Sequence, residues 1–172
     1  MMACLDRLSS GESREKRVFI AALITGAAML FCDVATKLYF TRTLVPGERI
    51  TVIPGWFDLT LVGNTGAAWS ILSGYGYLLL AVGILAAIAI GYFFRFLTEG
   101  CPERYFAMFL ILSGIIGNSI DRLWRGAVID FLSFHYFDAY YYPVFNVADI
   151  AICCGVGIYL ISGFCRKEPH RS

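Results

Sequence analysis

Residues 105–122, which read YFAMFLILSGIIGNSIDR, decide the fold class of this chain. Small and polar residues recur in this run at positions i, i+3, i+4, i+7 and i+8, which form one stripe of a helix. They are Gly114, Gly117, Asn118, Asp121 and Arg122. The remaining face is apolar, as in a helix that turns its polar groups toward a bundle and its apolar groups toward lipid; it holds Ile111, Leu112, Ile115, Ile116 and Ile120. The segment therefore predicts a membrane-spanning helix with a polar inner face.

The whole chain has the composition of an integral membrane protein. Of its 172 residues, 58% are hydrophobic and 16% are charged, against about 45–50% and about 25% in soluble domains. Because a bilayer core needs about 20 apolar residues, the apolar runs predict an α-helical integral membrane protein, a single domain over 1–172. Its four transmembrane helices are expected at about 18–40, 77–97, 105–122 and 144–165, with outer loops at 41–76 and 123–143.

Lysine and arginine are distributed unevenly between the two sides of these spans. Nine precede the first span, flank the short 98–104 turn or follow the fourth span: Arg7, Arg14, Lys16, Arg17, Arg95, Arg104, Arg166, Lys167 and Arg171. The opposite loops hold Arg42, Arg49 and Arg125, with Lys37 and Arg122 at span ends. Since basic residues collect on the cytoplasmic side, we predict cytoplasmic termini. The net charge of +1 offers no basic field for nucleic acid.

The first apolar run has a second interpretation, a cleaved signal peptide, because a charged leader precedes it. Apolar residues continue beyond Cys32 to Phe40, and Phe31 is a poor residue for cleavage, so we favour a retained helix. The leader before Val18 suggests no second function.

Cysteine and histidine indicate neither a disulfide framework nor a metal site. None of the six cysteines lies in the two outer loops. Disulfides would be favoured in those loops, because they face the oxidising side of the membrane. His135 and His170 are isolated from other metal-ligating residues. We therefore expect no metal and no cofactor.

The two outer loops have different patterns. Apolar and polar residues alternate over 57–61, which predicts a strand, and Pro54-Gly55 separates it from the apolar residues at 50–53. With a turn at 63–66 leading toward 67–72, the first loop predicts a small extracytoplasmic antiparallel sheet. The second loop holds eight aromatic residues between Phe131 and Phe145. These predict a belt of aromatic rings at the membrane surface. For one or two of the rings, contact with substrate is the alternative role.

Charged residues at membrane depth are costly and tend to be paired or functional. Asp33 and Lys37 stand four apart, which suits an ion pair on one helical face. Their role is open between a structural salt bridge and the binding of a substrate head group. For Asp121, a structural polar network and a functional role are both open, because the neighbouring Arg122 could neutralise it.

Two further acids, Asp130 and Asp149, are expected at the outer ends of the third and fourth spans, and Asn146 shares a helical face with Asp149. Two carboxylates brought together cannot both ionise cheaply, so one keeps a proton while the other activates water. The spacing therefore raises the hypothesis of aspartic-protease chemistry. The alternatives are a transporter with a proton relay through Asp33, Asp121 and Asp149, and a structural membrane scaffold, which leaves the polar cluster unexplained.

Four motifs, in order and compatibly spaced over about residues 18–165, resemble those of the bacterial lipoprotein signal peptidases. The first span carries Asp33-x-x-x-Lys37, and the first loop carries Asn64-x-Gly66-Ala67-Ala68-x-Ser70 with Trp69 in the aromatic position. The third motif is Gly114-x-x-Gly117-Asn118-x-x-Asp121-Arg122 followed by Gly126-x-Val128-x-Asp130-Phe131. The fourth is Phe145-Asn146-x-Ala148-Asp149.

The resemblance implies that Asp130 and Asp149 are the catalytic pair of an aspartic endopeptidase. It places the following residues in a substrate-binding or supporting surround: Asn64, Gly66, Asn118, Arg122, Asn146, Asp121, Asp33 and Lys37. The implied substrate is a diacylglyceryl-modified prolipoprotein, cut before its lipobox cysteine, in the bacterial cytoplasmic (inner) membrane with the site near the outer face. Membrane lipid is the other expected partner, and we expect a monomer. From position alone, Trp56 and Trp69 are hypothesised to cover the substrate.

Overall fold

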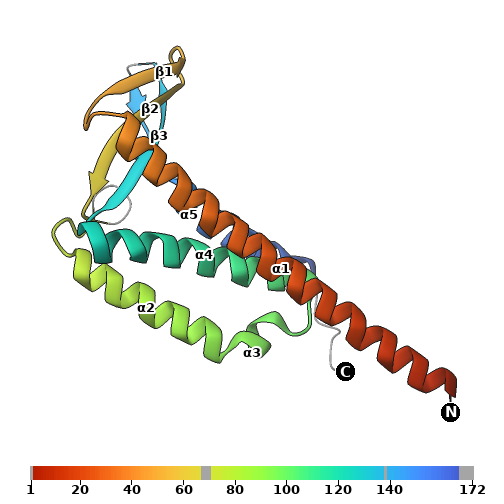
Figure 1. The fold of residues 1–172 in the computed structure, drawn as a ribbon. Coiled ribbons are helices and arrows are strands. Elements are labelled where there is room, and N and C mark those ends of the chain that lie inside the picture. Colours follow the sequence, from red (N-terminus) through yellow and green to blue (C-terminus); the bar gives the residue numbers. More distant parts are fainter. Residues whose placement is uncertain (1, 67–70, 138, 167–172) are drawn as a thin grey trace.

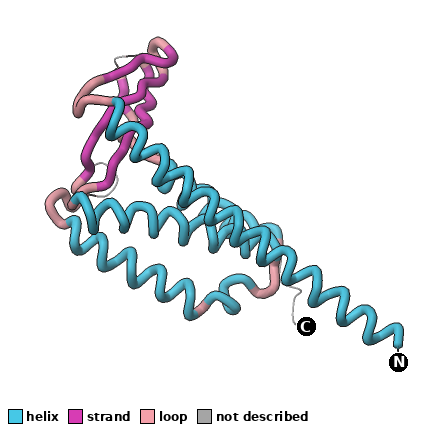
Figure 2. Tube along the Cα trace, viewed as in Figure 1, coloured by secondary structure: helices cyan, strands magenta, loops and turns pink. Residues whose placement is uncertain are grey.

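The computed structural model describes residues 2–66, 71–137 and 139–166. Its elements follow in the order α1 (Met2–Thr43), β1 (Arg49–Ile53), β2 (Phe57–Asn64), α2 (Gly76–Tyr92), α3 (Phe94–Thr98), α4 (Pro102–Arg125), β3 (Val128–Tyr136), β4 (Tyr140–Tyr141) and α5 (Val147–Cys165). The helices run alongside one another, and the strands gather beyond one end of the bundle (Figure 1; Figure 2). The predicted combination of a helical protein with a small antiparallel sheet is confirmed.

Helix α4 lies at the centre of the bundle, in contact with α1, α2 and α5. Glycines allow α4 and α5 to approach closely. A Cβ atom on Gly155 would lie 2.7 Å from the carbonyl oxygen of Ala107, and a Cβ atom on Gly114 would overlap the carbonyl oxygen of Ala148. Small residues therefore permit the close helix packing that the stripe on α4 predicts.

The outward surfaces of the helices are apolar. Large side chains stand exposed on three of them, among them Phe31 (73%), Leu85 (65%) and Phe164 (83%). Within the described residues, three helical segments are long and apolar enough to cross a membrane: residues 13–43 of α1, α4 and α5. Helix α2 is apolar but has only 17 residues. Such surfaces are suited to lipid rather than water.

Two helix boundaries differ from those predicted. The expected span at 77–97 is divided, because α2 ends at Tyr92 and α3 begins at Phe94, with Phe93 between them. Helix α1 begins at Met2 instead of near residue 18, so that the charged leader continues the transmembrane helix. At 1.5 Å per residue, a helix of this length extends about 63 Å, roughly twice the thickness of the hydrocarbon core.

The sheet has the strand order β1-β2-β3-β4, and all pairs are antiparallel. The alternating pattern at 57–61 correctly predicts β2. Strand β2 pairs with β1 within the first loop, as predicted. Its second pairing was not predicted: β2 also pairs with β3, from the second loop, and Val62 stands opposite Asp130. The expected continuation of the first-loop sheet at 67–72 falls partly on residues 67–70, outside the described residues. Pairing of β2 with β3 brings Asn64 and Asp130 together from distant parts of the chain.

Candidate active site

The polar stripe of α4 is buried in the bundle. Gly114, Gly117, Asn118 and Asp121 are buried, whereas Ile116, on the other side of the helix, is exposed. Because α1 and α5 pack against this stripe, its polar groups meet side chains from both helices. The site is therefore built outward from α4.

A buried charge cluster joins α1 to α4. The Lys37 Nζ atom lies 2.8 Å from Asp33 Oδ2 and 3.0 Å from Asp121 Oδ2. It also donates a hydrogen bond to Asn118 Oδ1 at 3.0 Å. The predicted ion pair of Asp33 and Lys37 is confirmed. Because Lys37 contacts both carboxylates and an amide, one cation organises the whole cluster.

The partner of Asp121 differs from the one predicted. Asp121 pairs with Arg125 as well as with Lys37, and Arg122 is not one of its ion-pair partners. The reason is geometric: residues four apart lie on one face of a helix, whereas adjacent residues diverge. Asp121 Oδ2 also accepts from the backbone N–H of Ile129 at 3.2 Å. This bond fixes the start of β3 one residue before Asp130.

Asp33 connects the charge cluster to the start of α5. Its Oδ1 atom accepts a hydrogen bond from the backbone N–H of Ala148 at 2.9 Å. A Cβ atom on Gly117 would overlap Asp33 Oδ2, so the glycine provides the space for this carboxylate. The carboxylate of α1 thereby holds the residue that precedes Asp149.

Asn146 and Asp149 form a capping box at the beginning of α5. The backbone N–H of Asp149 donates to Asn146 Oδ1 at 3.0 Å, and that of Asn146 donates to Asp149 Oδ2 at 3.1 Å. The other carboxylate oxygen, Oδ1, accepts from Asn118 Nδ2 at 2.8 Å. Helix capping and the partial positive charge of a helix N-terminus both favour a carboxylate there.

Asp130 is buried on β3, where only 2% of its surface is exposed. Its Oδ1 atom accepts from Asn146 Nδ2 at 2.6 Å, and its Oδ2 atom accepts from Asn64 Nδ2 at 3.0 Å. Burial raises the pKa of Asp130 to about 7, and the charge of Asp149 adds to the increase. Asn146 therefore connects the two aspartates, because it caps the helix of one and donates to the other.

Arg122 holds the loop that follows β2. Its guanidinium donates to the carbonyl oxygen of Gly66 at 3.1 Å, and the backbone N–H of Gly66 donates to Asn64 Oδ1 at 2.9 Å. Arg122 thus supports the position of Asn64, which contacts Asp130. The rest of this motif, Ala67, Ala68, Trp69 and Ser70, lies outside the described residues.

One cavity, of about 850 Å³, takes in both aspartates. Its polar lining consists of Asn64, Gly66, Asn118, Arg122, Asp130 and Asp149. Its other walls come from Gly83 of α2, Ile115 of α4 and the α5 residues Ile152, Cys153 and Cys154. The cavity therefore joins a polar end beside the sheet to a largely apolar part between helices. This arrangement can hold an extended polar group and an apolar segment at the same time.

All ten residues that the sequence proposes for the site occur in this connected region. Six line the cavity, whereas Asn146, Asp121, Asp33 and Lys37 lie behind it and hold the others. The sequence missed a wall at 141–145, from Tyr141 to Phe145. The cluster of aromatic residues in the second loop was the available signal, since one or two of them could contact substrate. Trp56 instead packs on Tyr136 and Phe137, and it is not among the described residues that line the cavity.

Comparison with known proteins places this geometry in a family. The family described as Signal peptidase (SPase) II matches residues 24–165. The lipoprotein signal peptidase of Geobacter metallireducens is 43% identical over 152 residues, which cover 87% of this chain and 93% of the relative. That of Clostridium acetobutylicum is 40% identical over 143 residues, which cover 83% and 91%.

Two solved structures share the fold. Both are described as a bacterial membrane enzyme structure by the in meso method, one at 2.3 Å and the other at 1.9 Å resolution. The first has a TM-score of 0.79 and 30% identity and covers 88% of this chain and 94% of its own. The second has a TM-score of 0.76 and 31% identity and covers 86% and 94%. From the family match and these relatives, the chain belongs to the signal peptidase II family of lipoprotein signal peptidases and is a multi-pass membrane peptidase.

Proposed function

We propose that this protein is an intramembrane aspartic endopeptidase that removes signal peptides from prolipoproteins. It cleaves the peptide bond before the diacylglyceryl-modified lipobox cysteine. The observation that carries the proposal is the meeting of Asp130 and Asp149 in one cavity, where amide side chains hold both carboxylates. This is the arrangement that aspartic-protease chemistry requires.

The two aspartates share one proton near neutral pH. Asp130 is the member that keeps it, because burial and the charge of Asp149 raise its pKa to about 7. Asp149, at the N-terminus of α5, is the proposed general base. The pair therefore supplies a general acid and a general base to the same cavity.

Hydrolysis proceeds by attack of water on the carbonyl carbon of the bond before the cysteine. Asp149 takes a proton from the water while Asp130 gives its proton to the carbonyl oxygen, which forms a neutral tetrahedral diol. Collapse of the diol breaks the carbon–nitrogen bond. A hydroxyl proton returns to Asp130, and the proton on Asp149 passes to the nitrogen, which leaves as the free amine of the cysteine.

The shape of the cavity supports a lipid-modified, membrane-embedded substrate. Its apolar walls, including Gly83, Ile115 and Ile152, suit acyl chains and the signal helix. A helix in lipid satisfies its own backbone hydrogen bonds, so the substrate must unwind where its carbonyl is to be attacked. The polar end of the cavity offers Asn64 and Arg122 as groups that bind the unwound backbone.

The remaining residues of the site support the catalytic pair. Asn118 and Asn146 orient the two carboxylates, and Gly66 holds Asn64 in position. Asp33, Lys37 and Asp121 support α5 and β3, which carry the catalytic pair. The proposed enzyme works as a monomer, with no metal and no cofactor.

The proposed topology has four spans, with α2 and α3 together forming the second. Both termini are cytoplasmic, and the sheet lies on the outer face of the bacterial inner membrane. The excess of Lys and Arg at the ends opposite the sheet supports this orientation. The active site then lies near the outer face, where a prolipoprotein emerges.

The test is cleavage of a diacylglyceryl-modified prolipoprotein by the purified protein in detergent. We expect Asp130→Asn and Asp149→Asn each to lower kcat by about 10²–10⁴-fold, because either change removes the shared-proton pair. Asp58→Asn is the matched control, since Asp58 is a buried aspartate on β2 that does not line the cavity. Circular dichroism of each variant checks that it folds.

Full cleavage by either cavity variant would remove the catalytic assignment. Cleavage of the same prolipoprotein without its diacylglyceryl group, at an equal rate, would contradict the proposed specificity. Activity should persist in EDTA, and its loss there would contradict a metal-free mechanism.

A further inference from the structure

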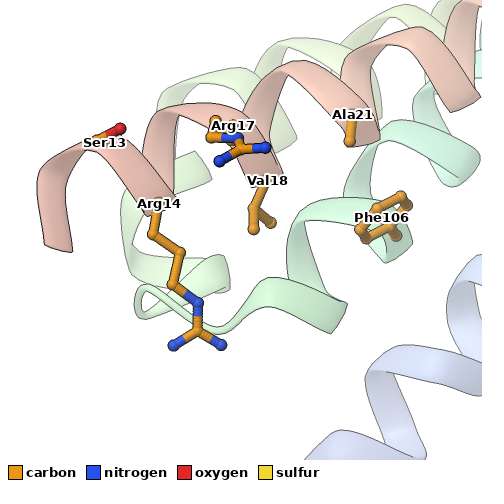
Figure 3. A pocket seen from close by; sticks show the side chains of 6 residues that line it. All are labelled: Ser13, Arg14, Arg17, Val18, Ala21 and Phe106. Atoms are coloured by element: carbon orange, nitrogen blue, oxygen red, sulfur yellow. The ribbon is translucent and has the colours of Figure 1, made fainter. Parts of the chain in front are cut away.

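A second cavity, of about 490 Å³, lies far from the aspartates, between the N-terminal part of α1 and the beginning of α4. Five lining residues belong to α1 and one, Phe106, to α4. Figure 3 shows Arg14, Val18 and Ala21 extending from α1 toward the space beside Phe106. The proposed catalytic mechanism makes no use of this site.

The α1 wall has an ordered arrangement of charge. Arg14, Arg17, Val18 and Ala21 occupy positions i, i+3, i+4 and i+7, and therefore form one helical stripe. The two arginines stand at the N-terminal end of the stripe, and the apolar residues follow them into the predicted span. The cavity thus offers two cations at one end and apolar walls at the other.

These two cations lack an internal counter-charge in the described residues. Arg49, Arg104, Arg125 and Arg166 each lie within 4.0 Å of a carboxylate, whereas no described carboxylate pairs with Arg14 or Arg17. The adjacent Glu15 accepts a hydrogen bond from the Tyr105 hydroxyl at 2.7 Å. Both guanidinium groups are exposed and are therefore available to an anion from outside the chain.

We propose that this cavity binds an anionic diacyl phospholipid. The phosphodiester headgroup lies between Arg14 and Arg17, and an acyl chain follows Val18 and Ala21 along Phe106. Depth supports this occupant, because the apolar run of α1 begins at Val18, where the headgroup region ends and hydrocarbon begins. Basic pockets between transmembrane helices on the cytoplasmic side bind such headgroups. The leaflet assignment rests on the proposed topology.

A zwitterionic lipid fits less well. Its phosphate is accompanied by an ammonium group, which two nearby guanidinium groups repel, whereas phosphatidylglycerol has the phosphodiester charge alone. Free inorganic phosphate satisfies the cations but leaves the apolar walls empty. Charge and shape together therefore favour the anionic lipid.

Native mass spectrometry of the full-length protein, released from micelles that contain a stated lipid, tests the proposal. We expect phosphatidylglycerol to bind more tightly than phosphatidylcholine. Arg14→Gln/Arg17→Gln should weaken phosphatidylglycerol binding by about 30-fold, since each of the two basic groups at a membrane surface contributes a factor of about five. Arg42→Gln/Arg95→Gln is the matched control. It removes two exposed arginines outside the cavity and should keep the affinity of the parent protein.

A second variant changes the cavity without changing its charge. Ala21→Leu places a larger side chain in the space proposed for the acyl chain, and this overpacking should weaken phosphatidylglycerol binding by about fivefold or more. Equal loss in the Arg42/Arg95 control would show diffuse attraction to the membrane and overturn the site. Full affinity in Ala21→Leu, or equally tight binding of inorganic phosphate alone, would overturn its assignment to a diacyl lipid.

Discussion

Two pairs of aspartates stand side by side in this protein and are held in opposite ways. Asp33 and Asp121 both lie within 3.0 Å of the Lys37 ammonium. Asp130 and Asp149 instead accept hydrogen bonds from asparagine amides and backbone N–H groups. Among the described residues, no lysine or arginine forms an ion pair with either of them. Asp33, Asp121 and Asp130 are buried and Asp149 is half-buried, so the charge of the partner distinguishes the two pairs more clearly than burial does.

The contrast has a direct consequence for proton chemistry. The Lys37 ammonium forms ion pairs with both Asp33 and Asp121, and such buried pairs can serve as a fixed support. Asp130 has only uncharged amide donors among its hydrogen-bond partners, and burial and the charge of Asp149 raise its pKa to about 7. One pair is therefore suited to structure, and the other to the exchange of a proton.

The largest expected effect comes from removal of the shared cation. Lys37→Met leaves Asp33 and Asp121 buried with less compensating charge, and breaking a buried ion pair costs about 3–5 kcal/mol of unfolding free energy. Denaturant unfolding in detergent measures this loss. The double variant Asp33→Asn/Lys37→Met removes one charge of each sign and should recover part of it. A single variant as stable as the parent protein would contradict the structural role of the cluster.

The next effect concerns the stability cost of a raised pKa. Native Asp130 keeps a proton that the unfolded chain releases, so its contribution reduces stability as pH rises from about 4 to about 7. Asp130→Asn has no such proton. We therefore expect the unfolding free energy of the variant to increase relative to that of the parent protein across this range, by up to about 4 kcal/mol at pH 8.

Unfolding of both proteins at pH 4 and pH 8 isolates this contribution, because other titrating groups are common to the two. A stability difference that stays the same at both pH values would contradict the raised pKa.

The smallest effect tests one amide donor. Asn64 stabilises ionised Asp130, so Asn64→Ala should raise the pKa of Asp130 further. In the proposed mechanism, activity falls at high pH as the shared proton is lost. The alkaline limb of the kcat profile should therefore move to higher pH, by less than about one pH unit. A limb that moves to lower pH would contradict this role of the amide.

Local spacing was sufficient to predict much of the site. The stripe on residues 114–122 follows from helical periodicity, and its burial is confirmed. The four-residue interval between Asp33 and Lys37 predicts their ion pair for the same reason. Asn146 and Asp149, three apart at the start of an apolar run, share a face because they form a capping box. These features depend on neighbours within one or two helical turns.

Features that depend on distant pairing were missed. The aromatic character of β3 resembles that of an interfacial belt, and no local pattern shows that β2 lies beside it. The break at Phe93 has neither proline nor glycine at that position. Arg125 as partner of Asp121 was accessible from the four-residue spacing, but the adjacent Arg122 was considered instead. Strand register and the choice among nearby cations require the folded structure.

The capping box at the start of α5 has a further consequence. Both oxygens of Asp149 are occupied before any substrate arrives, one by the backbone of Asn146 and the other by the Asn118 amide. In the proposed reaction, this carboxylate needs little reorientation before it accepts a proton from water, because the bonds that begin the helix have already oriented it. The free energy of orienting the base is thus spent during folding, once, and not in each turnover.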